Sequence, residues 1–143
     1  MEQNQETAAK EISNFKDTKY ATGKRKTSIA KVWLKKGSGK IIINGKSFED
    51  YFKRANHKMQ VLRPFEIINQ PTDYDVKCNV TGGGLTGQVG ALVHGISKAL
   101  LLFDSGLKPT LKKEKLTTRD SRTVERKKYG HRKARRSFQF SKR

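Results

Sequence analysis

Residues 78–96, which read CNVTGGGLTGQVGALVHGI, decide how the central part of the chain folds. The first letters end an alternating apolar run that begins at Tyr74, three glycines follow, and an apolar stripe of helical spacing comes next. Alternation with a period of two predicts a strand with one buried face, whereas apolar residues three and four apart predict a helix. The stretch therefore predicts a strand, a tight glycine loop and a long core helix over residues 88–104, starting near Thr86.

The glycines also match the outline of a dinucleotide-binding loop, G-x-G-x-x-G, at Gly82, Gly84 and Gly87. That fold requires a parallel strand after the helix, ending in the acid that binds the ribose hydroxyls. Here Asp104 lies at the end of the helix itself and Pro109 follows among lysines, so the unit is incomplete. We interpret the match as accidental, and a nucleotide-dependent enzyme remains the rival function.

Two readings of the glycine loop stay open. Glycines leave room for a phosphate or sugar edge of RNA to approach backbone N–H groups, and the start of a helix adds its positive end. Alternatively, Gly82, Gly83 and Gly84 only shape the turn between strand and helix.

Residues 20–45, upstream of this unit, predict two strands joined by a hairpin turn and followed by a second tight turn. Apolar residues around Trp33 are followed by a Lys-Lys-Gly-Ser-Gly turn, three isoleucines and an Asn-Gly turn. Ser47 precedes Phe48 and Phe52 and predicts the cap of a short helix. Apolar residues over 61–68 predict another helix, which starts or bends at Pro64.

Charge divides the chain of 143 residues. It carries 32 Lys and Arg against 13 acids, a formal net charge of +19, and residues 108–143 alone hold 15 of the basic residues and three acids. So strong a positive charge predicts a polyanionic partner. We expect a disordered extension over residues 1–17, a globular domain over 18–107, and a basic C-terminal extension over 108–143.

The basic extension lacks apolar spacing beyond Leu116 and cannot form a core of its own. A solvated, disordered tail is one interpretation. The interleaved aromatic residues and the scarcity of acids favour a segment that becomes ordered on RNA.

Other chemistry has little support in the sequence. Cys78 is the only cysteine, and His57, His94 and His131 are scattered without acids or cysteines at metal-ligand spacing. No run approaches the roughly 18 apolar residues of a membrane span, and the polar, acidic start is unlike a signal peptide. We therefore expect a soluble intracellular protein without catalytic residues, metal, cofactor or membrane partner.

Three stretches carry a family resemblance: GGGLTGQVGALVHGISKAL, TRDSRTVERKKYGHRKARRSFQFSKR and YATGKRKTSIAKVWL. Together they resemble the bacterial-type ninth protein of the small ribosomal subunit, and the resemblance covers residues 18–143. It implies an α+β fold: a two-layer domain with a mixed β-sheet packed by helices, a left-handed βαβ crossover and a long, extended basic C-terminal tail. The family usually has proline where this chain has Phe138, and residues 1–17 have no clear counterpart.

The resemblance also implies partners. It places such a protein as a monomer in the head of the subunit, on small-subunit ribosomal RNA and beside neighbouring head proteins, with its tail reaching the peptidyl-site tRNA. A cytoplasmic ribosome is favoured over an organellar one. A DNA-compacting basic protein is the third functional hypothesis, and it would bind any duplex.

Carried over residue by residue, the resemblance assigns two sets of contacts. Ribosomal RNA is expected at Lys24, Arg25, Lys26, Gly82, Gly83, Gly84, Gln88, Arg119, Arg122, Arg126, Lys127, Lys128, Arg132, Lys133, Arg135 and Arg136. The backbone of the tRNA anticodon stem-loop is expected at Lys142 and Arg143, positioned by Ser141.

Overall fold

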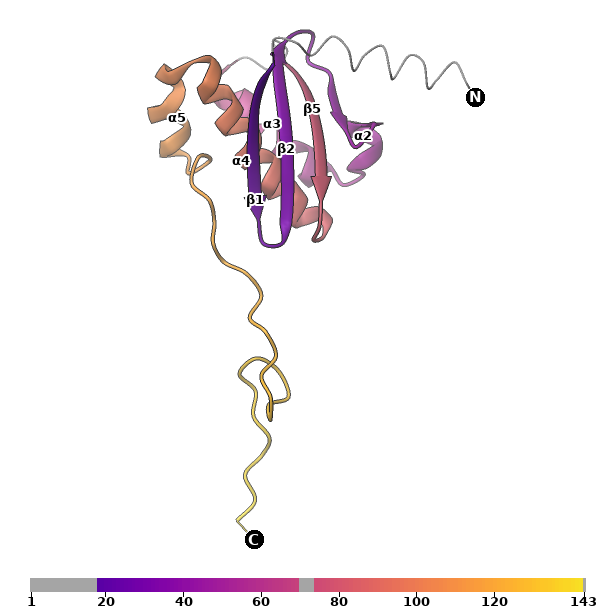
Figure 1. Cartoon of the computed structure of the whole chain (residues 1–143), viewed down its shortest axis with the longest axis vertical. Coiled ribbons are helices and arrows are strands. Elements are labelled where there is room, and N and C mark those ends of the chain that lie inside the picture. The colour runs from indigo at the N-terminus through magenta and orange to yellow at the C-terminus, as the bar shows by residue number, and fades with distance from the viewer. Residues whose placement is uncertain (1–17, 70–73, 143) are drawn as a thin grey trace, which may run out of the picture.

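The computed structural model describes residues 18–69 and 74–142, so the expected disorder of residues 1–17 lies outside the described residues. The described part is an α+β fold in which a five-stranded sheet packs against helices (Figure 1). The elements are, in chain order, β1 Lys19–Arg25, β2 Ser28–Lys36, β3 Ile41–Ile43, β4 Lys46–Ser47, α2 Phe48–Tyr51, α3 Ala55–Ile67, β5 Tyr74–Thr81, α4 Leu85–Phe103, the 3-10 turn η1 Ser105–Leu107 and α5 Lys108–Lys113.

The sheet is mixed, as expected. Its strand order is β1-β2-β5-β3-β4, with β3 parallel to β5 and every other neighbouring pair antiparallel. The predicted hairpin between the Trp33 strand and the three isoleucines is wrong, because β5 lies between β2 and β3 in the sheet. The predicted alternation holds: Val76, Cys78 and Val80 of β5 are buried, and the residues between them are more exposed. Burial raises the pKa of the Cys78 thiol to about 12, so this cysteine stays protonated at neutral pH.

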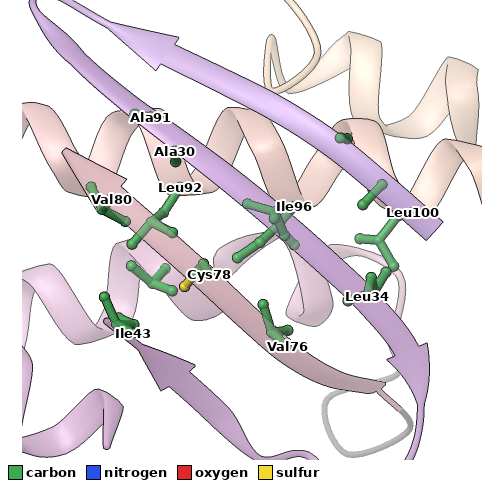
Figure 2. Packing of buried hydrophobic residues seen from close by; sticks show 14 of the residues in the cluster. Ala30, Leu34, Ile43, Val76, Cys78, Val80, Ala91, Leu92, Ile96 and Leu100 are labelled. Carbon is green, nitrogen blue, oxygen red and sulfur yellow. The ribbon is translucent and has the colours of Figure 1, made fainter. Parts of the chain in front are cut away.

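Helix α4 forms the core with the sheet (Figure 2). Leu92, Ile96 and Leu100 are fully buried and lie over the inward-facing residues of the strands. Small residues allow close packing of the sheet on the helix, because a Cβ on Gly23 of β1 would collide with the backbone of α4 at Ala91. The first strand therefore packs almost backbone to backbone on the helix.

Two helix boundaries differ from the sequence prediction. Helix α3 begins at Ala55 and continues through Pro64, so of the two alternatives a start at Pro64 was wrong, and a bend there stays a prediction. Helix α4 begins at Leu85 and ends at Phe103, close to the predicted range. Pro109 does not end helical structure, because it lies in the first turn of α5, where its missing N–H would have no intrahelical partner.

Helix α5 joins the basic segment to the core. Leu111 is fully buried, and Leu107 and Leu116 pack against the same hydrophobic cluster. Beyond α5, the described residues up to 142 contain no helix or strand, and the chain runs away from the domain (Figure 1).

Helix α4 has the length and apolar composition to cross a membrane, the only helix of the ranges 18–69 and 74–142 that does. Nine of its residues, including Val89 and Ala99, are buried within the protein. The helix is accordingly the core helix of a folded domain.

Candidate nucleic-acid interface

The predicted RNA-binding residues of the globular part gather at one end of the sheet. The β1–β2 turn and the β5–α4 loop lie together there, and the basic tail extends past the same end (Figure 1). Strand pairing holds the two loops side by side, since Ile29 of β2 pairs with Thr81 of β5. A Cβ on Gly82 would meet the carbonyl oxygen of Thr27 at 2.6 Å. Lys24, Arg25 and Lys26 thus adjoin the glycine loop.

The glycine loop has a structural requirement at two of its three positions. Gly82 and Gly83 have φ values of +74° and +63°, the left-handed region that L side chains rarely adopt. A Cβ on Gly83 would also collide with the Ser28 hydroxyl, which donates a hydrogen bond of 3.0 Å to the carbonyl of Gly82. Gly82 and Gly83 are therefore required for the conformation of the turn between strand and helix.

Gly84 is different. Its backbone is extended, with φ −105°, and a Cβ there would meet nothing within 4 Å. It is the N-cap residue of α4, whose N-terminus has no side-chain cap. Leu85 and Thr86, which follow, are exposed. The positive end of a long helix thus begins at exposed residues, an arrangement suited to an anion.

The side chain of Gln88 is held inside the protein. Its Nε2 donates to the Gly82 carbonyl at 3.2 Å, and its Oε1 accepts from the hydroxyl of Tyr51 at 2.8 Å. Gln88 thus braces the glycine loop against α2, and its predicted contact with RNA stays a prediction.

An ion pair fixes the start of the tail. Asp120 Oδ1 lies 3.0 Å from Nη1 of Arg25, and Asp120 Oδ2 lies 2.8 Å from Nη2 of Arg122. Arg25 Nη1 also donates to the backbone carbonyl of Arg122 at 3.1 Å. Hydrogen bonds from the Arg122 side chain hold the pKa of Asp120 well below its usual range. Asp120 therefore ties the tail to β1 beside the glycine loop.

His94 of α4 adds a second tie at the same place. Its Nδ1 accepts a hydrogen bond of 3.3 Å from the backbone N–H of Lys24, and the ring also bonds the backbone of Thr117. Burial, followed by the charge of Lys98, lowers the pKa of His94, which favours a neutral ring. His94 of α4 thus links the helix to Lys24 of β1 and to Thr117, which precedes Asp120 in the tail.

Farther along, the tail contacts itself. Glu125 pairs with Arg135 at 2.9 Å and with Lys128 at 3.8 Å. Arg132 lies over the ring of Phe138, 5.0 Å from its centroid, and its backbone N–H donates to the Arg136 carbonyl at 2.7 Å. The ring of Phe138 thus packs against an arginine of the same tail.

The remaining predicted contacts are exposed along the tail. They are Arg119, Arg126, Lys127, Lys133, Ser141 and Lys142. Arg143 lies outside the described residues. The structure thus brings together the β1–β2 turn, the glycine loop and the tail start, and leaves the tip of the tail apart.

Sequence reasoning missed Asp120 and His94. Asp120 was counted only as one of the few acids, and its isolation among cations was the available signal. In the described ranges, no three His, Cys, Asp or Glu side chains are placed to hold a metal ion, and no strand follows α4 as a dinucleotide fold would need.

These features define a class: a basic α+β protein with an anion-accepting loop end and a core-less cationic tail, which is a structural nucleic-acid-binding protein. A comparison with protein families makes the assignment specific. The chain matches the model of the Ribosomal protein S9/S16 family over residues 23–143, and it belongs to that family. It is a non-enzymatic structural protein of the small ribosomal subunit, with ribosomal RNA and ribosomal proteins as partners.

Proposed function

We propose that this chain binds ribosomal RNA in the head of the small subunit through the loop end of its sheet and its tail. The proposal rests on the ion pair between Asp120 and Arg25. This pair places the start of the cationic tail beside the exposed N-terminus of α4. One phosphate backbone can follow the loop end and continue along the tail, because both are positive and adjoin each other.

The finer features implied by the family belong to the same proposal. The tip, Ser141 to Arg143, contacts the anticodon stem-loop of the peptidyl-site tRNA, while head proteins lie beside the globular part. The crossover is left-handed, the tail is ordered by RNA, and the protein works as a monomer in a cytoplasmic ribosome. Support comes from the family match to the end of the chain and from the exposed Ser141 and Lys142.

A binding comparison tests the proposal against its two rivals. The full-length protein is titrated with a transcript of the head domain of small-subunit ribosomal RNA, a duplex DNA of equal length, and NAD or ATP. We expect the ribosomal RNA to bind at least about a thousandfold more tightly than the DNA at physiological salt, within the range typical of specific recognition. Saturable nucleotide binding would favour the enzyme, and equal affinity for RNA and DNA would favour a DNA-compacting protein.

A further inference from the structure

The sheet has a second face that no described helix covers. Helices α3 and α4 lie behind β1, β2 and β5, whose opposite face is turned to the viewer in Figure 1. The strands alternate accordingly, with buried residues on the helix side and exposed or partly exposed residues on the other. By strand register, the open face carries Tyr20, Thr22, Lys24, Ile29, Lys31, Trp33, Lys35, Ile42, Asp75, Lys77, Asn79 and Thr81.

One row of this face combines aromatic rings and a cation. Tyr20, Trp33, Lys77 and Ile42 are consecutive register partners across β1, β2, β5 and β3. The rings of Tyr20 and Trp33 lie 5.2 Å apart between centroids, tilted by 41°. Tyr20 is 45% exposed, and Trp33 is partly exposed. The two rings are thus an aromatic platform on a flat surface.

The charge of the open face is positive. Four lysines, at positions 24, 31, 35 and 77, stand on it with one acid, Asp75. Asp75, near the start of β5, lies 3.9 Å from Nζ of Lys35 and accepts hydrogen bonds from the backbone N–H groups of Ser38 at 2.8 Å and Lys40 at 3.0 Å. Lys31, whose register partners are Thr22 and Asn79, has no acid directly opposite it on the neighbouring strands.

This composition fits RNA better than a protein partner. The cores of protein interfaces are depleted in lysine, whereas lysines beside stacking aromatics are how sheets bind single-stranded nucleic acid. The face also continues into the loop end, because Lys24 ends it on β1 and Thr81 ends it on β5, next to Gly82. An RNA strand on the loops can therefore extend onto the sheet.

We infer that the open sheet face is a second RNA-binding surface, which takes an unpaired ribosomal RNA segment. One base stacks on the Tyr20–Trp33 platform, and Lys31 contacts a flanking phosphate. The inference rests on the proposed function, since it assumes that the chain binds ribosomal RNA, and it adds a face and a type of RNA structure to it.

Trp33 provides a direct readout because it is the only tryptophan of the chain. The full-length protein is titrated with the head-domain transcript while Trp33 emission and its quenching by acrylamide are followed. A stacked base quenches the emission and shields the ring from acrylamide. Both changes should saturate at the stoichiometry found by filter binding.

Matched variants separate stacking, charge and fold. Trp33→Phe keeps an aromatic ring, so its RNA affinity should lie within about twofold of the wild type. Trp33→Leu should bind RNA at least about fivefold more weakly than the wild type. Lys31→Glu should reduce the slope of log affinity against log salt by roughly 0.7 to 0.9 or more. Lys112→Glu is the charge-matched control and should leave the slope nearly unchanged, because Lys112 is exposed on α5, which packs on the core through Leu111 and precedes the tail residues expected to contact RNA. Thermal midpoints check that every variant folds.

The outcomes distinguish the two proposals. Tight ribosomal RNA binding with unchanged Trp33 emission, and equal slopes for Lys31→Glu and Lys112→Glu, would overturn the second surface and leave the proposed function standing. Shielding of Trp33 only after other small-subunit proteins are added would assign this face to a protein partner and also overturn the inference. Failure to bind ribosomal RNA at all would contradict the proposed function itself.

Discussion

At the scale of single residues, Gly84 separates the two readings of the glycine loop. Gly82 and Gly83 cannot do so, because a substitution there strains a positive φ and collides with Thr27 or Ser28. Gly84 has ordinary backbone angles and open space, so a side chain at this position changes what the loop presents without changing its shape.

Gly84→Asp should stabilise the fold while weakening RNA binding. An aspartate at the N-cap of α4 adds a few tenths of a kcal/mol over glycine, and more through the helix dipole. The same carboxylate would face an approaching phosphate and lower the affinity for the head-domain transcript about tenfold. Thermal unfolding and filter binding measure the two effects.

Gly84→Asn is the matched control, since it caps equally well without charge. It should raise stability like the aspartate variant and keep most of the affinity. If the two variants bound RNA alike, no phosphate would lie at the start of α4, and the loop would have only its structural role.

The direction in which RNA affinity changes when Asp120 is replaced tests whether its carboxylate positions the tail. Asp120→Asn removes a negative charge from a basic region, which alone would strengthen RNA binding. If the carboxylate positions the tail through Arg25 and Arg122, the loss of preorganisation should instead weaken binding, by on the order of threefold. Hydrogen exchange at the Arg122 amide, which donates to Asp120 at 3.0 Å, should accelerate.

Glu114→Gln provides the control for Asp120→Asn. Glu114 is also an exposed acid paired with an arginine, Arg63, at 2.8 Å, but it lies beside α5 and does not hold the tail on β1. Neutralising it should leave RNA affinity unchanged or slightly higher. Equal or stronger RNA binding by Asp120→Asn would show that the ion pair does not position the tail.

At the scale of elements, helices and strands were predictable where the hydrophobic periodicity is strong. They were missed where they depend on contacts between residues far apart in the chain. The β5–loop–α4 unit was predictable because alternation changes to helical spacing within one stretch. The start of α3 was missed because Pro64 was read as a boundary, although a buried proline is accommodated within the helix. Helix α5 was missed because a single buried residue, Leu111, lies in a lysine-rich segment.

The candidate site was predictable only in part, for the same reason. The basic residues and glycines were evident from composition and from the family resemblance. The ion pair between Arg25 and Asp120 joins residues 95 positions apart, and no local sequence pattern predicts it. The open face with Trp33 likewise depends on strand order, which places β5 between β2 and β3.

The tip of the tail is expected to contribute to tRNA binding and not to subunit assembly. Removing residues 141–143 should leave subunit assembly nearly intact, because the described residues Ser141 and Lys142 are exposed and lie far from the core. Two charge-assisted contacts are worth roughly 1.5–3 kcal/mol each when well formed, and less in a hydrated tail. Peptidyl-site tRNA affinity should therefore fall about tenfold.

Filter binding of deacylated tRNA to programmed subunits measures this loss, with full-length or truncated protein incorporated. Sucrose-gradient sedimentation of the same subunits checks that assembly is complete. Equal tRNA affinities over several salt concentrations would remove the tRNA role of the tip and leave the ribosomal RNA role unaffected.

At the scale of the whole molecule, the protein combines a small folded domain with a cationic segment that has no core. The domain holds the loop end of the sheet rigid through α4, and Asp120 and His94 set where the tail leaves it. The tail then has few internal contacts, chiefly those of Glu125 and Arg132, to fix its course. We therefore propose, as the central claim, that its order comes largely from a bound polyanion.

The salt dependence of ribosomal RNA binding tests that claim most directly. Residues 127–143 hold eight Lys and Arg and no acid. Each phosphate contact adds roughly 0.7 to 0.9 to the slope of log affinity against log salt, so deleting these residues should flatten the slope by several units. An unchanged slope for the truncated protein would contradict the account, because the tail would then be a solvated charge run that does not bind RNA.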